Sequence, residues 1–175
     1  MNHIDQEGQE RLASGRTRSL LLGCVFMAAA LNSSIPGAIN RTLIDMPAWQ
    51  HVGATAWVTF SRWADLGPGL ILYPLEYISG TVFSVIAAVV FYINRRIMAR
   101  SLAVPIYATA LCSLGVMLAT TQAAPAMLST LHLSDPTSLQ QALNTFWFWG
   151  GVRGGCFLLS SVASLWSLVV VSRMH

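Results

Sequence analysis

The stretch 136-PTSLQQALNTFWFWGGVRGGCFLLSSVASLWSLVVVS-172 carries only one Asp, Glu, Lys or Arg residue, which is Arg153. Three further stretches carry at most one such residue: residues 19–40, 66–94 and 101–134. Each is long enough to cross a bilayer as a helix, which takes about 20 apolar residues. Backbone polar groups must be paired inside lipid, and the stretches have no alternating barrel pattern, so helices are the expected spans. The sequence therefore predicts an all-α integral membrane protein.

Composition agrees with a membrane location. The chain is 54% hydrophobic and 10% charged, whereas soluble domains carry about 25% charged residues. The net charge of +3 does not indicate a nucleic-acid partner, because most basic residues form two clusters beside apolar stretches. These clusters are Arg11, Arg16 and Arg18, then Arg95, Arg96 and Arg100. Such positions are typical of the cytoplasmic flanks of membrane spans.

The arginine clusters predict a topology for a four-helix bundle. Residues 1–18 are a cytoplasmic N-terminal tail, and residues 19–175 form a single four-span domain. The predicted spans are residues 19–40, 68–93, 102–122 and 149–172. Both termini are then cytoplasmic in a bacterial inner membrane, and the loops 41–66 and 123–147 face outward.

The first outer loop predicts an amphipathic helix over residues 48–64. Its apolar residues recur at steps of three and four: Trp49, Val52, Ala56, Phe60 and Trp63. Pro47 suits the first turn of such a helix. A helix rich in tryptophan is typical of the membrane interface. It can equally form a lid packed on the bundle, and the two arrangements are compatible.

Several residues predict where helices begin, break or approach one another. Pro36-Gly37 is expected to break the outer end of the first span, and Pro125 lies just past the predicted end of the third. Asp135-Pro136 predicts the start of a helix that continues into the fourth span. Small residues allow close helix packing at two places: Gly80, Ser84 and Ala88, then Gly150, Gly151, Gly154 and Gly155.

Arg153 and Glu76 are charged residues within predicted membrane spans, so their positions need an explanation. Arg153 either extends to the outer headgroups or is held inside the bundle, against an anion, a carbonyl or Glu76. Glu76 lies about 12 Å into the outer leaflet, counted from Pro68 at 1.5 Å per residue. It should be protonated, paired or in a polar cavity, with Tyr73 and Tyr77 as hydrogen-bond donors. A structural Glu–Arg pair and a functional cavity both remain open.

Other candidate site residues lie near the outer ends of the spans. His51 could act as a base at the outer mouth, beside Glu76 and Arg153 as the other catalytic candidates. Ligand-binding candidates are Tyr73, Tyr77, Trp49, Trp149 and Asn32. The four histidines show no ligand spacing on one helix, and phosphate-binding or nucleophile motifs are missing. We therefore expect no metal and no cofactor.

The chain resembles the small four-span membrane proteins that are similar to anthrone oxygenases, many known only as a domain of unknown function. The resemblance rests on Pro36 after the first span, the Trp-containing outer loop, and the segment from Asp135-Pro136 through Leu139, Ala142-Leu143 and Phe146 to Trp149 and Arg153. It implies a cofactor-free oxygenase that converts anthrones into anthraquinones. This chain has Gly150-Gly151 where the family usually carries an Asn.

The expected function is therefore to bind or oxidise a small hydrophobic molecule, aromatic or quinone-like, that arrives from the bilayer. The alternative is a non-enzymatic accessory or structural subunit, whose Gly and Ser faces pack against a membrane-protein partner or further copies of the chain. A transporter is less favoured, because four spans without an internal repeat would need to oligomerise to form a path.

Overall fold

The computed structural model describes residues 3–32 and 40–173, and within these ranges the chain is helical without strands. The long helices are α1 (His3–Leu31), α5 (Gly69–Ile93), α6 (Ala103–Ser129) and α7 (Pro136–Ser172). The short ones are the π-helical turn η1 (Arg41–Asp45), α3 (Met46–Val52), α4 (Ala54–Trp63) and the 3-10 turn η2 (Arg100–Leu102). The all-α prediction is confirmed.

Three helices are long and apolar enough to cross a membrane: α5, α6 together with η2, and α7. They contain the predicted spans 68–93, 102–122 and 149–172. The predicted first span, 19–40, is helical as far as Leu31. Its outer end, including the expected break at Pro36-Gly37, lies outside the described residues. The structure thus establishes three candidate spans of the four.

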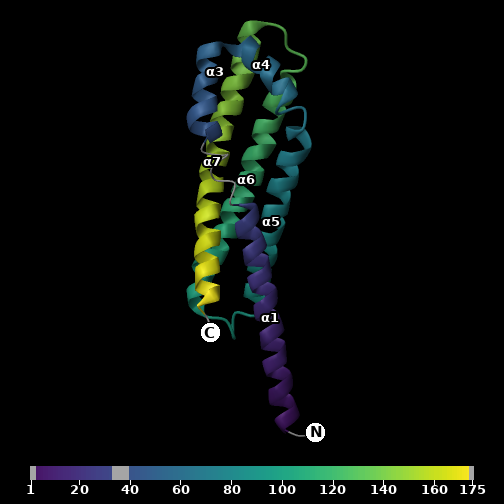
Figure 1. Cartoon of the computed structure of the whole chain (residues 1–175), viewed down its shortest axis with the longest axis vertical. Helices are drawn as coiled ribbons and strands as arrows, with labels where there is room; N and C mark the ends of the chain where they lie inside the picture. Colours follow the sequence, from purple (N-terminus) through teal and green to yellow (C-terminus); the bar gives the residue numbers. More distant parts are fainter. Residues whose placement is uncertain (1–2, 33–39, 174–175) are drawn as a thin grey trace.

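The long helices pack side by side. α6 packs along α7 and α5, while α1 packs against α5 and α7. The N-terminal part of α1 extends beyond the other helices at the end where α7 finishes, and α3 and α4 lie at the opposite end (Figure 1). Because α1 begins at His3, the predicted tail of residues 1–18 is helical from there on and continuous with the first apolar stretch.

α7 begins where the sequence predicts. The Asp135 side chain accepts a hydrogen bond from the Ser138 backbone N–H at 2.9 Å, and Pro136 occupies the first turn. α6 differs from the prediction, since it continues to Ser129 with Pro125 inside the helix. A proline removes one backbone hydrogen bond, and the buried Ala123 and Met127 offset this loss by packing in an apolar cluster.

The predicted 48–64 helix is two helices, α3 and α4, joined at Gly53. Gly53 has φ 89° and ψ 158°, a conformation open essentially to glycine alone. The break shifts the buried face, so that Trp57, Val58 and Ser61 are buried in α4. Of the apolar residues predicted to share one face, Trp49 is buried. The other large ones, Val52, Phe60 and Trp63, are exposed.

Two apolar clusters and a polar layer form the interior. One cluster joins α1, α5, α6 and α7 near the chain termini, around Leu21, Phe91 and Ile106. The other fixes α3 and α4 on α6 and α7, and we call it the cap cluster: Met46, Trp49, Trp57, Val58, Ala123, Met127, Leu139, Leu143 and Phe146. Between them lies what we call the serine layer, in which Ser84, Ser113 and Ser160 are buried and linked by hydrogen bonds.

Candidate ligand-binding site

A pocket lies between the N-terminal part of α5, the C-terminal part of α6 and the N-terminal half of α7. It has about 530 Å³ of empty space, counting its open mouth. Most of its wall is apolar: Leu66, Gly69, Leu70, Pro74, Ala124, Met127, Leu128 and Phe146. The polar lining residues are Arg41, Asp65, Tyr73, Tyr77, Thr120 and Arg153. An apolar wall with a few convergent polar groups is typical of small-molecule sites.

The mouth of the pocket opens between α5 and α6. The exposed lining residues of α5 are Leu70, Tyr73 and Pro74, and α6 contributes the exposed Leu128. Leu70 and Leu128 expose 51% and 41% of their surface, which is unusual for leucines beside a cavity in a water-soluble protein. Their exposure is ordinary for side chains that face lipid tails. The mouth of the pocket is therefore lined by apolar side chains.

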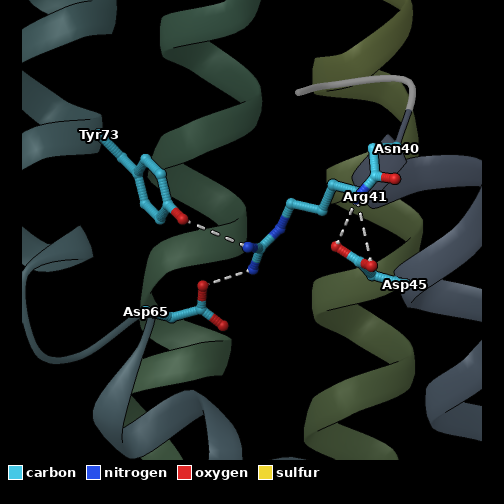
Figure 2. A network of polar contacts seen from close by, with 5 residues as sticks. All are labelled: Asn40, Arg41, Asp45, Asp65 and Tyr73. Carbon is cyan, nitrogen blue, oxygen red and sulfur yellow. Dashed lines mark hydrogen bonds and ion pairs between the residues drawn. The ribbon is translucent and has the colours of Figure 1, made fainter. Parts of the chain in front are cut away.

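An ion pair closes the end of the pocket next to the cap cluster. Arg41 Nη2 donates to Asp65 Oδ1 at 2.6 Å, and Arg41 Nη1 lies 3.5 Å from the hydroxyl of Tyr73 (Figure 2). The arginine comes from η1 and the aspartate from the turn after α4, so the pair ties the two ends of the outer loop together. The Asp65 side chain is only 5% exposed. Breaking such a buried pair is expected to be strongly destabilising.

Aromatic rings support Arg41 from two sides. Its guanidinium carbon lies 5.5 Å from the centre of the Trp49 ring and 5.6 Å from that of Tyr73. Trp49 in turn stacks on Trp57 and on Phe146, a lining residue of the pocket. Trp49 is thus one layer behind the pocket wall, where it orients the arginine.

Arg153 reaches the pocket from α7. Its guanidinium carbon lies 5.4 Å from the centre of the Tyr77 ring and 5.9 Å from that of Phe146. Cation–π contacts of this kind contribute about 2 kcal/mol when desolvated. They hold the charged group against two rings of the pocket wall. Among the described residues, the contacts seen for the Arg153 side chain are these two rings.

The structure brings some predicted site residues together and separates others. Arg153, Tyr73 and Tyr77 line the pocket. Glu76 is half-buried on α5 and does not line it; the Glu76 carbonyl accepts from Ser79 Oγ at 3.1 Å. His51 is exposed on α3, away from the lining residues. Its predicted place at the mouth is therefore not supported.

The remaining predicted residues serve packing. Trp149 is half-buried against the cap cluster, with its ring beside that of Phe148. Asn32 is buried at the end of α1, where its carbonyl accepts a hydrogen bond from Ser161 Oγ. The Asn32 side-chain oxygen would lie 3.1 Å from a Cβ added at Gly80, so α1 and α5 approach closely at this predicted packing face.

Arg41 and Asp65 are the pocket residues that the sequence prediction missed. They lie 24 positions apart in a loop, so no helical periodicity links them. Their signal is electrostatic, because an arginine and an aspartate of opposite charge lie at the two ends of the segment 41–66. Comparisons with protein families, curated proteins and solved structures find no match for this chain.

Proposed function

We propose that this chain is an integral membrane protein that binds a small hydrophobic molecule, aromatic or quinone-like, in the pocket between α5, α6 and α7. The observation that carries the proposal is the combination of an apolar wall, a mouth framed by exposed leucines, and four polar aromatic or cationic side chains. Tyr73, Tyr77, Arg41 and Arg153 offer ring faces and hydrogen-bond donors to a ligand that carries oxygen atoms.

A filled pocket tests this proposal. Ala124→Phe places a ring inside the lining, whereas Leu118→Phe places one on an exposed face of the same helix, at a residue that is 69% exposed. Quenching of intrinsic fluorescence by 1,4-naphthoquinone in nanodiscs measures binding. We expect Ala124→Phe to weaken binding by about tenfold or more, which is about 1.4 kcal/mol or more. Leu118→Phe should bind like the parent. Undiminished binding in a folded Ala124→Phe variant would contradict the proposal.

The proposed topology has α1 as a fourth span, with both termini in the cytoplasm of a bacterial inner membrane. The arginine cluster in the N-terminal part of α1 and the one between α5 and α6 support it, as does the packing of α1 against α5 and α7. A reporter fused after His175 should be cytoplasmic, and one inserted at Ser134 should be external. Both reporters on one side of the membrane would contradict the four-span topology.

The resemblance to anthrone-oxygenase-like proteins supports an oxidation as the reaction of the bound molecule. Incubating the purified protein with anthrone under oxygen should then give anthraquinone, followed by its absorbance, at a rate lowered by Ala124→Phe. If the protein binds anthrone but does not oxidise it faster than the protein-free solution, the chain is a binding protein and the oxygenase reaction is excluded.

A second candidate function is an accessory subunit of a larger membrane complex. The specific observation in its favour is on α7, where a Cβ added at Gly151 or Gly155 would meet no atom within 4 Å. A Gly-x-x-x-Gly face left open in this way is suited to a helix from another chain. Stoichiometric co-purification of a partner that Gly151→Leu abolishes would favour this function over ligand binding.

A further inference from the structure

We propose that the ligand of this pocket is an anionic amphiphile, whose negative group binds Arg153 while its apolar body lies against the leucines of α5 and α6. This inference rests on the proposed binding function and names the chemical class of its ligand.

The charges of the pocket carry the first step. Three formally charged side chains line it, Arg41, Asp65 and Arg153. Arg41 and Asp65 neutralise each other at 2.6 Å. Arg153 keeps its charge, because its contacts are the rings of Tyr77 and Phe146, which are uncharged. The residues that line the pocket therefore carry one positive charge in excess, while Glu76, the neighbour of Tyr77 on α5, lies outside the lining.

The surroundings of Arg153 make that charge a binding group. A charged side chain within an apolar helix is costly, by about 2.5–3.5 kcal/mol at the bilayer centre, and such residues usually face a partner or a cavity. Arg153 is half-buried and faces the cavity. A guanidinium has five N–H donors in a planar fork that fits a carboxylate or phosphate with two parallel hydrogen bonds. Within the described residues, none of these donors is used.

The rest of the wall selects for an apolar body. Leu66, Pro74 and Met127 line the pocket without offering a hydrogen bond, and Leu70 and Leu128 form its mouth. An inorganic anion would leave this surface uncovered, and a neutral hydrocarbon would leave Arg153 uncompensated. An amphiphile with one negative group satisfies both parts of the pocket.

A matched pair of aromatic probes tests the inference. 2-Naphthoate and 2-naphthamide have nearly the same shape and differ in charge at neutral pH. Their affinities are measured by fluorescence titration of the full chain in nanodiscs of phosphatidylcholine. We expect the acid to bind about tenfold tighter than the amide, a difference of about 1.4 kcal/mol. Arg153→Gln should abolish this preference and leave amide binding in place, while Arg153→Lys should retain most of it.

Arg95→Gln is the control, because Arg95 also stacks on a tyrosine, at 4.8 Å from the Tyr92 ring centre, yet lies outside the pocket. It should keep the full preference. Equal affinities for the two probes in the parent protein would overturn the inference and leave the hydrophobic pocket standing, even if Arg153→Gln failed to fold. A preference that survives Arg153→Gln would overturn it as well. Binding of neither probe would overturn both proposals.

The same titration identifies the source of the anion. Phosphatidylglycerol included in the nanodiscs should displace 2-naphthoate if a lipid headgroup supplies the negative group. If the naphthoate affinity is unchanged, the ligand is a free amphiphile dissolved in the bilayer. Both results support an anionic ligand at Arg153, and they assign it to different molecules.

Discussion

The serine layer and the pocket are both polar regions within apolar helices, but they are built in opposite ways. In the serine layer, Ser113 Oγ lies 2.7 Å from Ser160 Oγ and donates to Ser84 Oγ at 3.2 Å, and Ser160 donates to the Thr109 carbonyl at 3.3 Å. Every hydroxyl there has a partner from a neighbouring turn or helix. Small, mutually paired groups let α5, α6 and α7 approach closely.

The pocket end has large charged and aromatic side chains, and several polar atoms there are unpaired. Among the described residues, Arg41 Nε and Asp65 Oδ2 of the pocket lining are buried without a hydrogen-bond partner, and so are Trp57 Nε1 and Ser61 Oγ on the adjoining α4. Elsewhere in the described part of the chain, Asn32 Nδ2 at the end of α1 is the further such atom. Buried polar groups are normally paired, so these atoms set the pocket end apart from the serine layer. The comparison teaches that the polar groups of the serine layer satisfy one another, whereas those of the pocket end leave hydrogen-bonding capacity unused.

The largest effect is expected from removing Asp65. Asp65→Ala leaves Arg41 charged and partly buried without its partner, which typically costs about 3–5 kcal/mol. The double variant Arg41→Met with Asp65→Ala should lose less, because no charge is then left unpaired. Denaturant titration followed by circular dichroism measures both. Asp45→Ala is the control, since Asp45 makes only exposed contacts with Asn40, at 3.3 and 3.4 Å (Figure 2), and its loss should be small.

Gly53→Ala is expected to have the next largest effect. The backbone at Gly53 lies in a region nearly closed to other residues, so an alanine there should cost about 1–3 kcal/mol. The strain acts on the joint between α3 and α4, so the fluorescence of the buried Trp49 and Trp57 should shift to the red before global unfolding. Gly15→Ala, in a helix with nothing near its added Cβ, should be neutral or slightly stabilising. Equal behaviour of the two variants would show that α3 and α4 are not anchored through Gly53.

A smaller effect is expected within the serine layer. Ser113→Ala removes the hydrogen bonds to Ser84 and Ser160, and such bonds inside membranes average about 0.6 kcal/mol each. A total loss of about 1 kcal/mol, with unchanged ligand binding, would sharpen the contrast with the pocket. The contrast would be contradicted if Ser113→Ala lowered the free energy of unfolding as much as Asp65→Ala does, or if it abolished naphthoate binding.

The smallest effect is expected at Trp63, which is 82% exposed on α4, in contrast to Trp49 at 8%. Trp63→Gln should change stability by less than about 0.5 kcal/mol. Lipids carrying a brominated chain should quench Trp63 and spare Trp49, because an exposed tryptophan beside apolar helices suits the membrane interface. Quenching of Trp63 by aqueous iodide alone would place α4 in solvent.

Apolar length and capping chemistry predict most of the fold from the sequence. Asp135-Pro136 fixes the start of α7, and long apolar stretches with at most one charged residue locate α5, α6 and α7. The sequence reading ended α6 too early, since it could not know that Ala123 and Met127 pack into the cap cluster. Their packing keeps α6 helical past Pro125, although a proline locally disfavours a helix interior.

The site was predicted in part for a similar reason. Arg153, Tyr73 and Tyr77 stand out because charges and phenols are conspicuous in apolar helices. Arg41 and Asp65 lie in a loop, and only the fold brings them together over 24 residues. The sequence left a Glu76–Arg153 pair and a functional cavity both open, because depth along two helices does not specify how the helices are rotated. In the structure, the rings of Tyr77 and Phe146 contact the Arg153 guanidinium.

The unbroken length of α7 has a mechanical consequence. Its 37 residues make a rod of about 55 Å, whereas the hydrocarbon thickness is about 30 Å. The helix is thus longer than a bilayer core by roughly 25 Å, and its N-terminal part supplies Leu139, Leu143 and Phe146 to the cap cluster. A tilt of about 10° moves the tip of such a rod sideways by roughly 10 Å, and membrane helices tilt to match bilayer thickness. For a membrane-embedded α7, the lateral position of the cap cluster would therefore change with the thickness of the bilayer.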